Sequence, residues 1–93
     1  MADNPLQAHL DQLLSSRAAP KTICPSEAAR ALSASELHSL GASDWRDLMP
    51  SARQFLFGMR DRGEVEIMQR GEVLSNDITL DNVKGPIRAR KKQ

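Results

Sequence analysis

Arginines carried by one long stretch are the side chains of this 93-residue chain best suited to contact a ligand. Arg53 and Arg60 lie between Pro50 and Gly63, and Gln54 follows Arg53. Arginine and glutamine side chains donate hydrogen bonds to phosphate oxygens and to the edges of bases. Further arginines precede and follow the stretch. The full set of candidate contacts to nucleic acid is Arg46, Arg53, Gln54, Arg60, Arg70, Arg88 and Arg90.

The stretch that carries these arginines is predicted to be a helix that leads into a strand. Pro50 fits the first position of a helix, and Gly63 can end one in the left-handed conformation. Residues 64–68 then alternate between polar and apolar, as a half-buried strand does. Phe57 falls opposite the apolar stripe of the helix, where it either packs under the wing or a terminal segment or belongs to a contact surface. The stripe consists of Ala52, Phe55, Leu56 and Met59.

Three further helices are expected before this stretch. They cover residues 5–17, 25–32 and, as a short element, 34–40. The short helix starts with a capping box, in which the side chains of Ser33 and Glu36 bond each other's backbone N–H groups. Helices in this number, followed by a hairpin, are typical of a helix-turn-helix protein with a β-hairpin wing.

Small strands complete the predicted fold. Residues 21–24 are a candidate first strand, and Gly71 supplies the positive φ that a hairpin tip needs before the return strand at 73–74. The fold class is therefore α+β: a winged helix-turn-helix with three main helices, a short inserted helix and a small antiparallel sheet. The residues that should be mostly buried are Leu10, Leu13, Ile23, Leu32, Trp45, Leu48, Phe55, Leu56, Met59, Val65, Ile67 and Ile87.

Composition limits the possible functions. The net charge is only +1, from 13 basic and 12 acidic residues, whereas nucleic-acid-binding domains are commonly strongly basic. The length indicates one domain over 1–93, with 88–93 as a basic and flexible tail. The sequence holds neither an apolar run of membrane-spanning length nor a signal peptide at its start, so a cytoplasmic location without membrane contact is expected.

Residues suited to catalysis or metal binding are sparse. The single Cys24 excludes an internal disulfide and a cysteine-rich zinc site. His9 and His38 have no partners at ligand spacing. The sequence also contains no nucleophile–base spacing and no phosphate-binding glycine loop. We therefore expect neither an enzyme nor a cofactor.

Four sequence blocks occur in a specific order. They are KTICPSEAAR at 21–30, WRDLMPSAR at 45–53, QRG at 69–71 and GPIR at 85–88. Through these blocks the chain resembles, over about residues 8–90, a family of small bacterial domains of unknown function that are predicted to be winged helices. The resemblance implies this fold and no particular activity. The chain departs from the family between Leu32 and Trp45, where the short helix within 33–44 looks like an insertion.

The resemblance also suggests a functional role for a polar cluster in the first two blocks. A structural role is an equal alternative, in which Glu27 pairs with an arginine and Trp45 packs over it. The cluster consists of Ser26, Glu27, Arg30, Trp45, Arg46 and Arg53.

Two functions are compatible with this fold. A DNA-binding, regulatory protein would place the arginine-bearing helix in the major groove of double-stranded DNA and Arg70 on the backbone. A protein-interaction module would instead use Phe57 and Met68 as a contact patch without touching DNA. Asp61 and Glu64 would repel phosphate near the proposed surface, but the arginines make nucleic-acid binding the favoured hypothesis.

Overall fold

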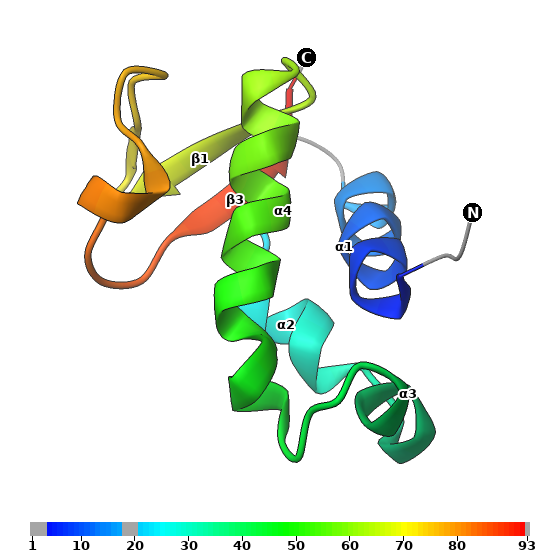
Figure 1. The fold of residues 1–93 in the computed structure, drawn as a ribbon. Coiled ribbons are helices and arrows are strands. Elements are labelled where there is room, and N and C mark those ends of the chain that lie inside the picture. The colour runs from blue at the N-terminus through cyan, green and yellow to red at the C-terminus, as the bar shows by residue number, and fades with distance from the viewer. Residues whose placement is uncertain (1–3, 18–20, 93) are drawn as a thin grey trace.

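Four α-helices precede a small three-stranded antiparallel sheet in the computed structural model, which describes residues 4–17 and 21–92 (Figure 1). The α+β, winged-helix-like order predicted from the sequence is confirmed. The helices are α1 (Pro5–Ser16), α2 (Pro25–Arg30), α3 (Ala34–Ser39) and α4 (Met49–Asp61), and the 3-10 helix η1 (Trp45–Leu48) leads into α4. The strands are β1 (Val65–Gln69), β2 (Glu72–Val73) and β3 (Arg88–Lys91), with the 3-10 helix η2 (Leu80–Asn82) between the last two.

The sheet has the order β2-β1-β3. The β1–β2 hairpin turns at Arg70 and Gly71, whose φ angles are 54° and 81°. Positive φ at both central residues is what a tight turn needs to match the twist of its strands. The expected first strand is reduced to Ile23, whose N–H donates to the Ala89 carbonyl at 2.7 Å and whose carbonyl accepts from the Ala89 N–H at 2.9 Å.

The basic tail at 88–93 was predicted to be flexible, and this is wrong for Arg88–Lys91, which forms β3. Gln93 lies outside the described residues. Ala89 is fully buried between Ile67 of β1 and Ile23. Arg88 is exposed, and its guanidinium donates to Thr22. The strand was not predicted because Ala89 is its one apolar residue and the other three are charged. Strands are usually recognised by several β-branched or aromatic residues, which this one lacks.

The core lies between the sheet, α1, α2 and α4, and most of the predicted core residues are buried. Leu13, Trp45 and Phe55 are exceptions and are only half-buried. Phe57 is 5% exposed, because a segment at 74–86 packs against the side of α4 that faces away from the helices. The helical periodicity in the sequence indicated one buried face of α4, so it could not predict that the opposite face is covered as well. The confirmed core residues are Leu10, Ile23, Leu32, Leu48, Leu56, Met59, Val65, Ile67 and Ile87.

Caps fix the helix starts. The Asn4 side chain accepts from the Leu6 N–H at 2.9 Å, and the predicted capping box joins Ser33 and Glu36 by bonds of 2.9 and 3.2 Å. Glu36 also lies 3.5 Å from His9 Nε2, so it connects α3 to α1. In the described part of the chain, no helix is both long and apolar enough to span a bilayer.

Leu56→Ala should lower the free energy of unfolding by about 2–5 kcal/mol, because Leu56 is fully buried and alanine leaves a cavity. Chemical denaturation measures this loss. Gln54→Ala on the exposed side of the same helix is the control and should change stability by less than about 0.5 kcal/mol. Equal effects of the two changes would contradict the assigned face of α4.

Candidate functional site

Arg60 of α4 lies buried beneath the segment at 74–86. Its side chain is 5% exposed, and its guanidinium donates to the carbonyl oxygens of Ile78 at 2.7 Å and Asn76 at 3.4 Å. It also pairs with Asp61 at 2.9 Å and stacks over the Phe57 ring at 4.7 Å. These contacts occupy the guanidinium. Arg60 is therefore not available to contact a ligand on this surface.

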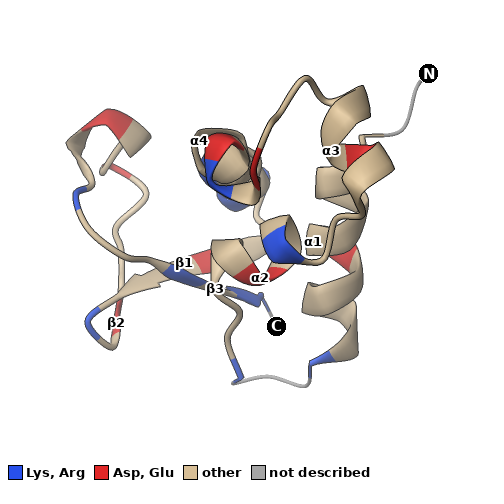
Figure 2. Cartoon of the chain, turned by 90° about the horizontal axis from the view of Figure 1, so that it is seen from below, with Lys and Arg blue, Asp and Glu red and all other residues tan. Residues whose placement is uncertain are grey.

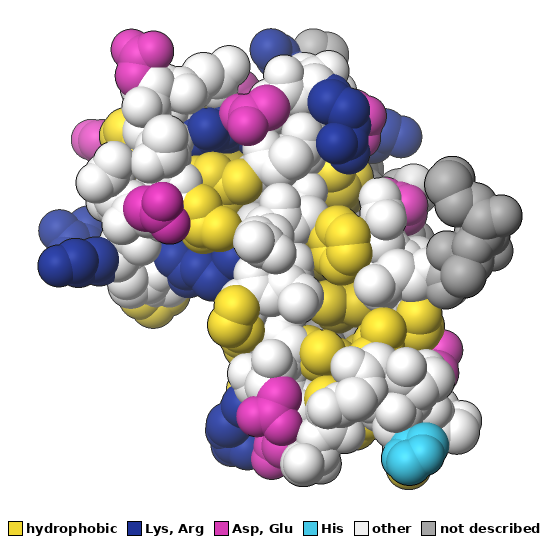
Figure 3. All heavy atoms as spheres, viewed as in Figure 1, with side chains coloured by type: hydrophobic (Ala, Val, Ile, Leu, Met, Phe, Trp, Pro, Cys, Tyr) yellow, Lys and Arg dark blue, Asp and Glu magenta, His cyan; other side chains and the backbone are white. Residues whose placement is uncertain are grey.

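Arg53 lies on the same face of α4, two turns before Arg60, and holds the same segment. Its guanidinium donates to the carbonyl oxygens of Gly85 at 3.0 Å and Val83 at 3.4 Å. Gln54 remains exposed on α4. The outer surface of the helix shows acidic, basic and hydrophobic side chains interspersed, without a continuous basic stripe (Figure 3). Arg53 and Arg60, the two arginines expected to contact DNA from α4, are therefore both bound to backbone carbonyl groups of the protein itself.

A hollow of about 400 Å³ instead gathers basic residues on the solvent side of the sheet. We call it the basic hollow. Arg70 at the hairpin tip, Lys84 before β3 and Arg88 on β3 line it, and none of its lining residues is acidic. In the described residues, no salt bridge involves any of these three cations. Figure 2 shows basic segments at the hairpin tip, in the loop before β3 and along β3.

The remaining lining of the basic hollow is apolar or small. Met68 lies opposite Arg88 across the β1–β3 pair, and Pro86 comes from the segment before β3. Gly71 and Gly85 also line the hollow, and both have positive φ. Side chains are rarely tolerated in that conformation, so the backbone forms the wall there without side chains that would fill the space.

Hydrogen bonds hold the two walls of the basic hollow together. Gln69 Nε2 donates to the Lys84 carbonyl at 2.6 Å and to the Pro86 carbonyl at 3.4 Å. These bonds join β1 to the segment before β3, which Arg53 holds from the α4 side. The shape of the hollow is therefore fixed by hydrogen bonds to the backbone and not only by the positions of long, flexible side chains.

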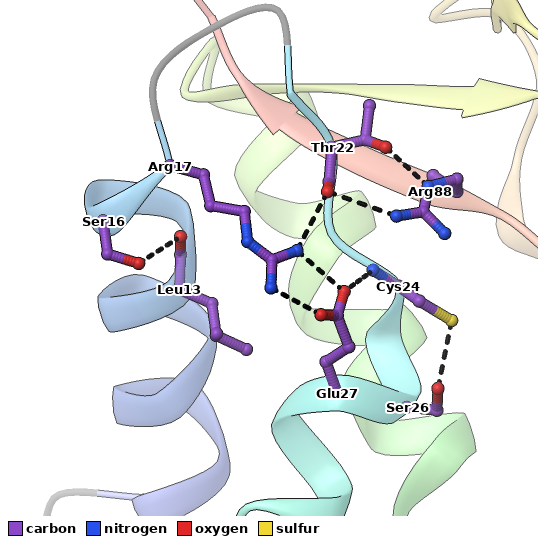
Figure 4. Close-up of polar contacts among 8 residues, drawn as sticks. All are labelled: Leu13, Ser16, Arg17, Thr22, Cys24, Ser26, Glu27 and Arg88. Atoms are coloured by element: carbon purple, nitrogen blue, oxygen red, sulfur yellow. Dashed lines mark hydrogen bonds and ion pairs between the residues drawn. The ribbon is translucent and has the colours of Figure 1, made fainter.

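A network centred on Glu27 supports the end of the hollow formed by Thr22 and Arg88 (Figure 4). The Glu27 carboxylate accepts two bonds from Arg17, at 2.6 and 3.0 Å, and one from the Cys24 N–H at 2.6 Å. The Thr22 carbonyl accepts from Arg17 at 3.1 Å and from Arg88 at 3.2 Å. The Arg17 guanidinium, the Cys24 N–H and the charge of Arg88 together hold the pKa of Glu27 below its ordinary value of 4.5.

The polar cluster predicted from the first two blocks does not stay together: Glu27 and Trp45 have different partners, and Arg53 bonds the segment at 74–86. Glu27 does pair with an arginine, but its partner is Arg17, which no spacing in the sequence singled out. Trp45 packs against the guanidinium groups of Arg30 at 4.7 Å and Arg46 at 4.6 Å, not over Glu27. None of the residues around Trp45 lines the basic hollow.

The structure thus brings together only part of the predicted contact set. Arg70 and Arg88 meet in the basic hollow, and Arg90 is neutralised by Glu66 at 2.9 Å on the neighbouring strand. Arg46 pairs with Asp44 and lies at η1. Lys84 also lines the basic hollow, although it was not among the predicted contacts.

The fold and this site define a small winged-helix-like α+β domain with a basic hollow beside its hairpin. The chain belongs to the family described as "Protein of unknown function (DUF3253)", a model of which matches residues 3–92. This membership agrees with the resemblance of its four sequence blocks. None of the curated proteins compared with the chain matches it. The family supplies no activity, so any function has to be inferred from the site.

Arg60→Ala should lower the free energy of unfolding by about 1–3 kcal/mol, because it leaves partly buried carbonyl groups without a donor. Thermal or chemical denaturation measures the loss. Arg62→Ala is the control, since Arg62 is more than half exposed and its pair with Glu64 is at the surface. Similar, small effects of both changes would show that the segment at 74–86 does not depend on Arg60.

The low pKa of Glu27 makes stability depend on pH. Its ionised form is favoured in the folded state, so its contribution is present above about pH 4.5 and is lost as the pH falls through its lower folded pKa. Glu27→Gln should lower the melting temperature at pH 7 and should show a smaller further loss between roughly pH 5 and 3 than the parent protein. The exposed Glu72→Gln is the control and should follow the parent curve. Parallel curves for the parent and Glu27→Gln would contradict this role of Glu27.

Proposed function

We propose that the chain binds nucleic acid through phosphate contacts made by the basic hollow, with the hairpin wing rather than α4 as the contact surface. The observation that carries this proposal is the convergence of Arg70, Lys84 and Arg88 on one hollow that no carboxylate lines. Cationic side chains that neutralise phosphates release condensed counterions, which is the main driving force of non-specific nucleic-acid binding. A local cluster supplies this force even when the net charge is only +1.

Recognition of base sequence in the major groove by α4 is not part of this proposal. Arg53 and Arg60 donate to backbone carbonyls of the segment at 74–86, so they are not free to read base edges. Asp61 and Glu64 are exposed at the end of the same helix and disfavour phosphate there. We expect affinity that depends strongly on salt and weakly on sequence.

The alternative, a protein-interaction module, has less support. Phe57, one of the two apolar anchors expected of its contact patch, is 5% exposed beneath the segment at 74–86. Met68, the other, is half-buried and lines the basic hollow. Interface hot spots are large side chains that a partner can bury, and a side chain that the chain itself covers cannot serve in this way.

Arg70→Ala combined with Lys84→Ala should weaken binding and reduce the slope of log affinity against log salt by up to about two units, because each lost phosphate contact removes roughly 0.7–0.9 units. Fluorescence anisotropy with short oligonucleotides of mixed sequence, single-stranded and duplex, measures the slope. Arg88 is left unchanged because it also bonds Thr22.

The matched control is Arg46→Ala combined with Arg62→Ala, which removes two positive charges from residues that are more than half exposed and do not line the basic hollow. The control should keep the parent slope. Equal losses in the two double variants would show that binding follows net charge, and unaltered binding by the hollow variant would refute the proposed contact surface.

A further inference from the structure

We infer that the basic hollow takes an unstacked base of a single-stranded nucleic acid, with the neighbouring phosphates on its basic rim. This inference rests on the proposed function and adds the type of strand. Its starting point is the size of the hollow. A volume of about 400 Å³ falls within the range of about 300–1,000 Å³ that is typical of pockets for small-molecule ligands.

A duplex does not need such a hollow. The bases of a double helix are stacked and paired, so a protein that binds only its backbone needs a charged surface that follows the phosphates. A single strand can turn a base away from its neighbours and place it in a pocket. A duplex can therefore contact only the basic rim of the hollow. A single strand can contact the rim with its phosphates and the interior with a base.

The apolar wall suits the face of a base. Met68 presents a polarisable thioether, which makes favourable contacts with aromatic rings, and the exposed Pro86 adds an apolar ring to the lining of the same hollow. Gly71 and Gly85 leave the neighbouring wall without side chains. Methionine and proline side chains contribute nothing to the binding of a phosphate. The apolar part of the lining therefore favours a ligand that has an apolar face as well as negative charge.

The rim suits the phosphates on either side of that base. Arg70, Lys84 and Arg88 come from three separate segments around the hollow: the hairpin turn, the loop before β3 and β3 itself. A base that enters the hollow carries its own phosphates to these segments. Single-strand-binding proteins combine the same two parts, a cationic path for the backbone and a surface for base faces.

Trp45, the sole tryptophan of the chain, does not compete as the base-binding surface. Its ring already packs against the guanidinium groups of Arg30 and Arg46, at 4.7 and 4.6 Å. Arg46 is in turn held by Asp44 at 3.3 Å. Among the described residues, the basic hollow combines apolar surface and space with cations that form no salt bridge.

Three labelled dodecamers of equal charge per strand test the inference by fluorescence anisotropy: a mixed-sequence single strand, the same strand in a duplex, and a strand with abasic sugars in place of nucleotides. The single strand should bind roughly tenfold more tightly than the abasic strand, because only it has bases to place in the hollow. It should also bind more tightly than the duplex.

Met68→Ser then probes the wall without altering charge. It should weaken binding of the single strand by about 2- to 10-fold, the range expected for a lost sulfur–aromatic contact, and leave binding of the abasic strand unchanged. Val73→Ser is the matched control. Val73 is the partner of Met68 across the hairpin and is 46% exposed, but it does not line the hollow.

The outcomes separate this inference from the proposed function. If the abasic strand and the duplex bind as tightly as the single strand, no base enters the hollow, and phosphate binding alone remains. If Met68→Ser and Val73→Ser weaken binding equally, the wall assigned to the base is wrong. If none of the three dodecamers binds, both the inference and the proposed function fail. The comparison of single and abasic strands uses the parent protein, so it holds even where a variant does not fold.

Discussion

The carboxylate of Glu27 is the group on which the arrangement of the site depends. Through Arg17 it attaches α1, and through the Cys24 N–H it caps the start of α2. Arg17 also bonds the Thr22 carbonyl, which Arg88 reaches from β3. One ionised group thus joins the helical part of the molecule to the sheet at the edge of the basic hollow. Hydrogen bonds to a charged acceptor are stronger than those between neutral groups, so a single carboxylate can hold several segments.

A second constraint comes from the segment at 74–86, which packs against α4 and changes what a winged-helix-like fold can offer to a ligand. Arg53 and Arg60 satisfy the carbonyl groups of this irregular segment, which would otherwise lie partly buried without donors. The helix that could contact DNA in related architectures is therefore used for internal support. The surface that we propose for nucleic-acid binding is therefore the wing, where Arg70 and Lys84 make no salt bridge with any described residue.

The sequence predicted those features that depend on local signals. Pro50 and Gly63 marked the main helix to within a residue or two, and Gly71 marked the hairpin. Each of these features follows from the backbone preference of the residue itself.

Other features depend on where distant segments return, and no periodicity encodes them. Arg17 and Glu27 face each other only because the chain folds back after α1. β3 was not predicted because its only buried side chain is Ala89, which packs between Ile67 and Ile23. Lys84 joins Arg70 in the hollow only once the segment before β3 has crossed to the hairpin, so the site itself could not be assembled from sequence spacing.

Two-dimensional ¹H–¹⁵N NMR, with a single-stranded oligonucleotide added stepwise to the ¹⁵N-labelled protein, tests the central claim most directly. The account predicts that the amide signals of residues 69–71 and of Lys84, Gly85, Ile87 and Arg88 shift first and furthest. Those of Thr22 and Ile23 should follow, while the exposed face of α4 around Gln54 stays unchanged. Shifts concentrated on α4, with none around the basic hollow, would contradict it.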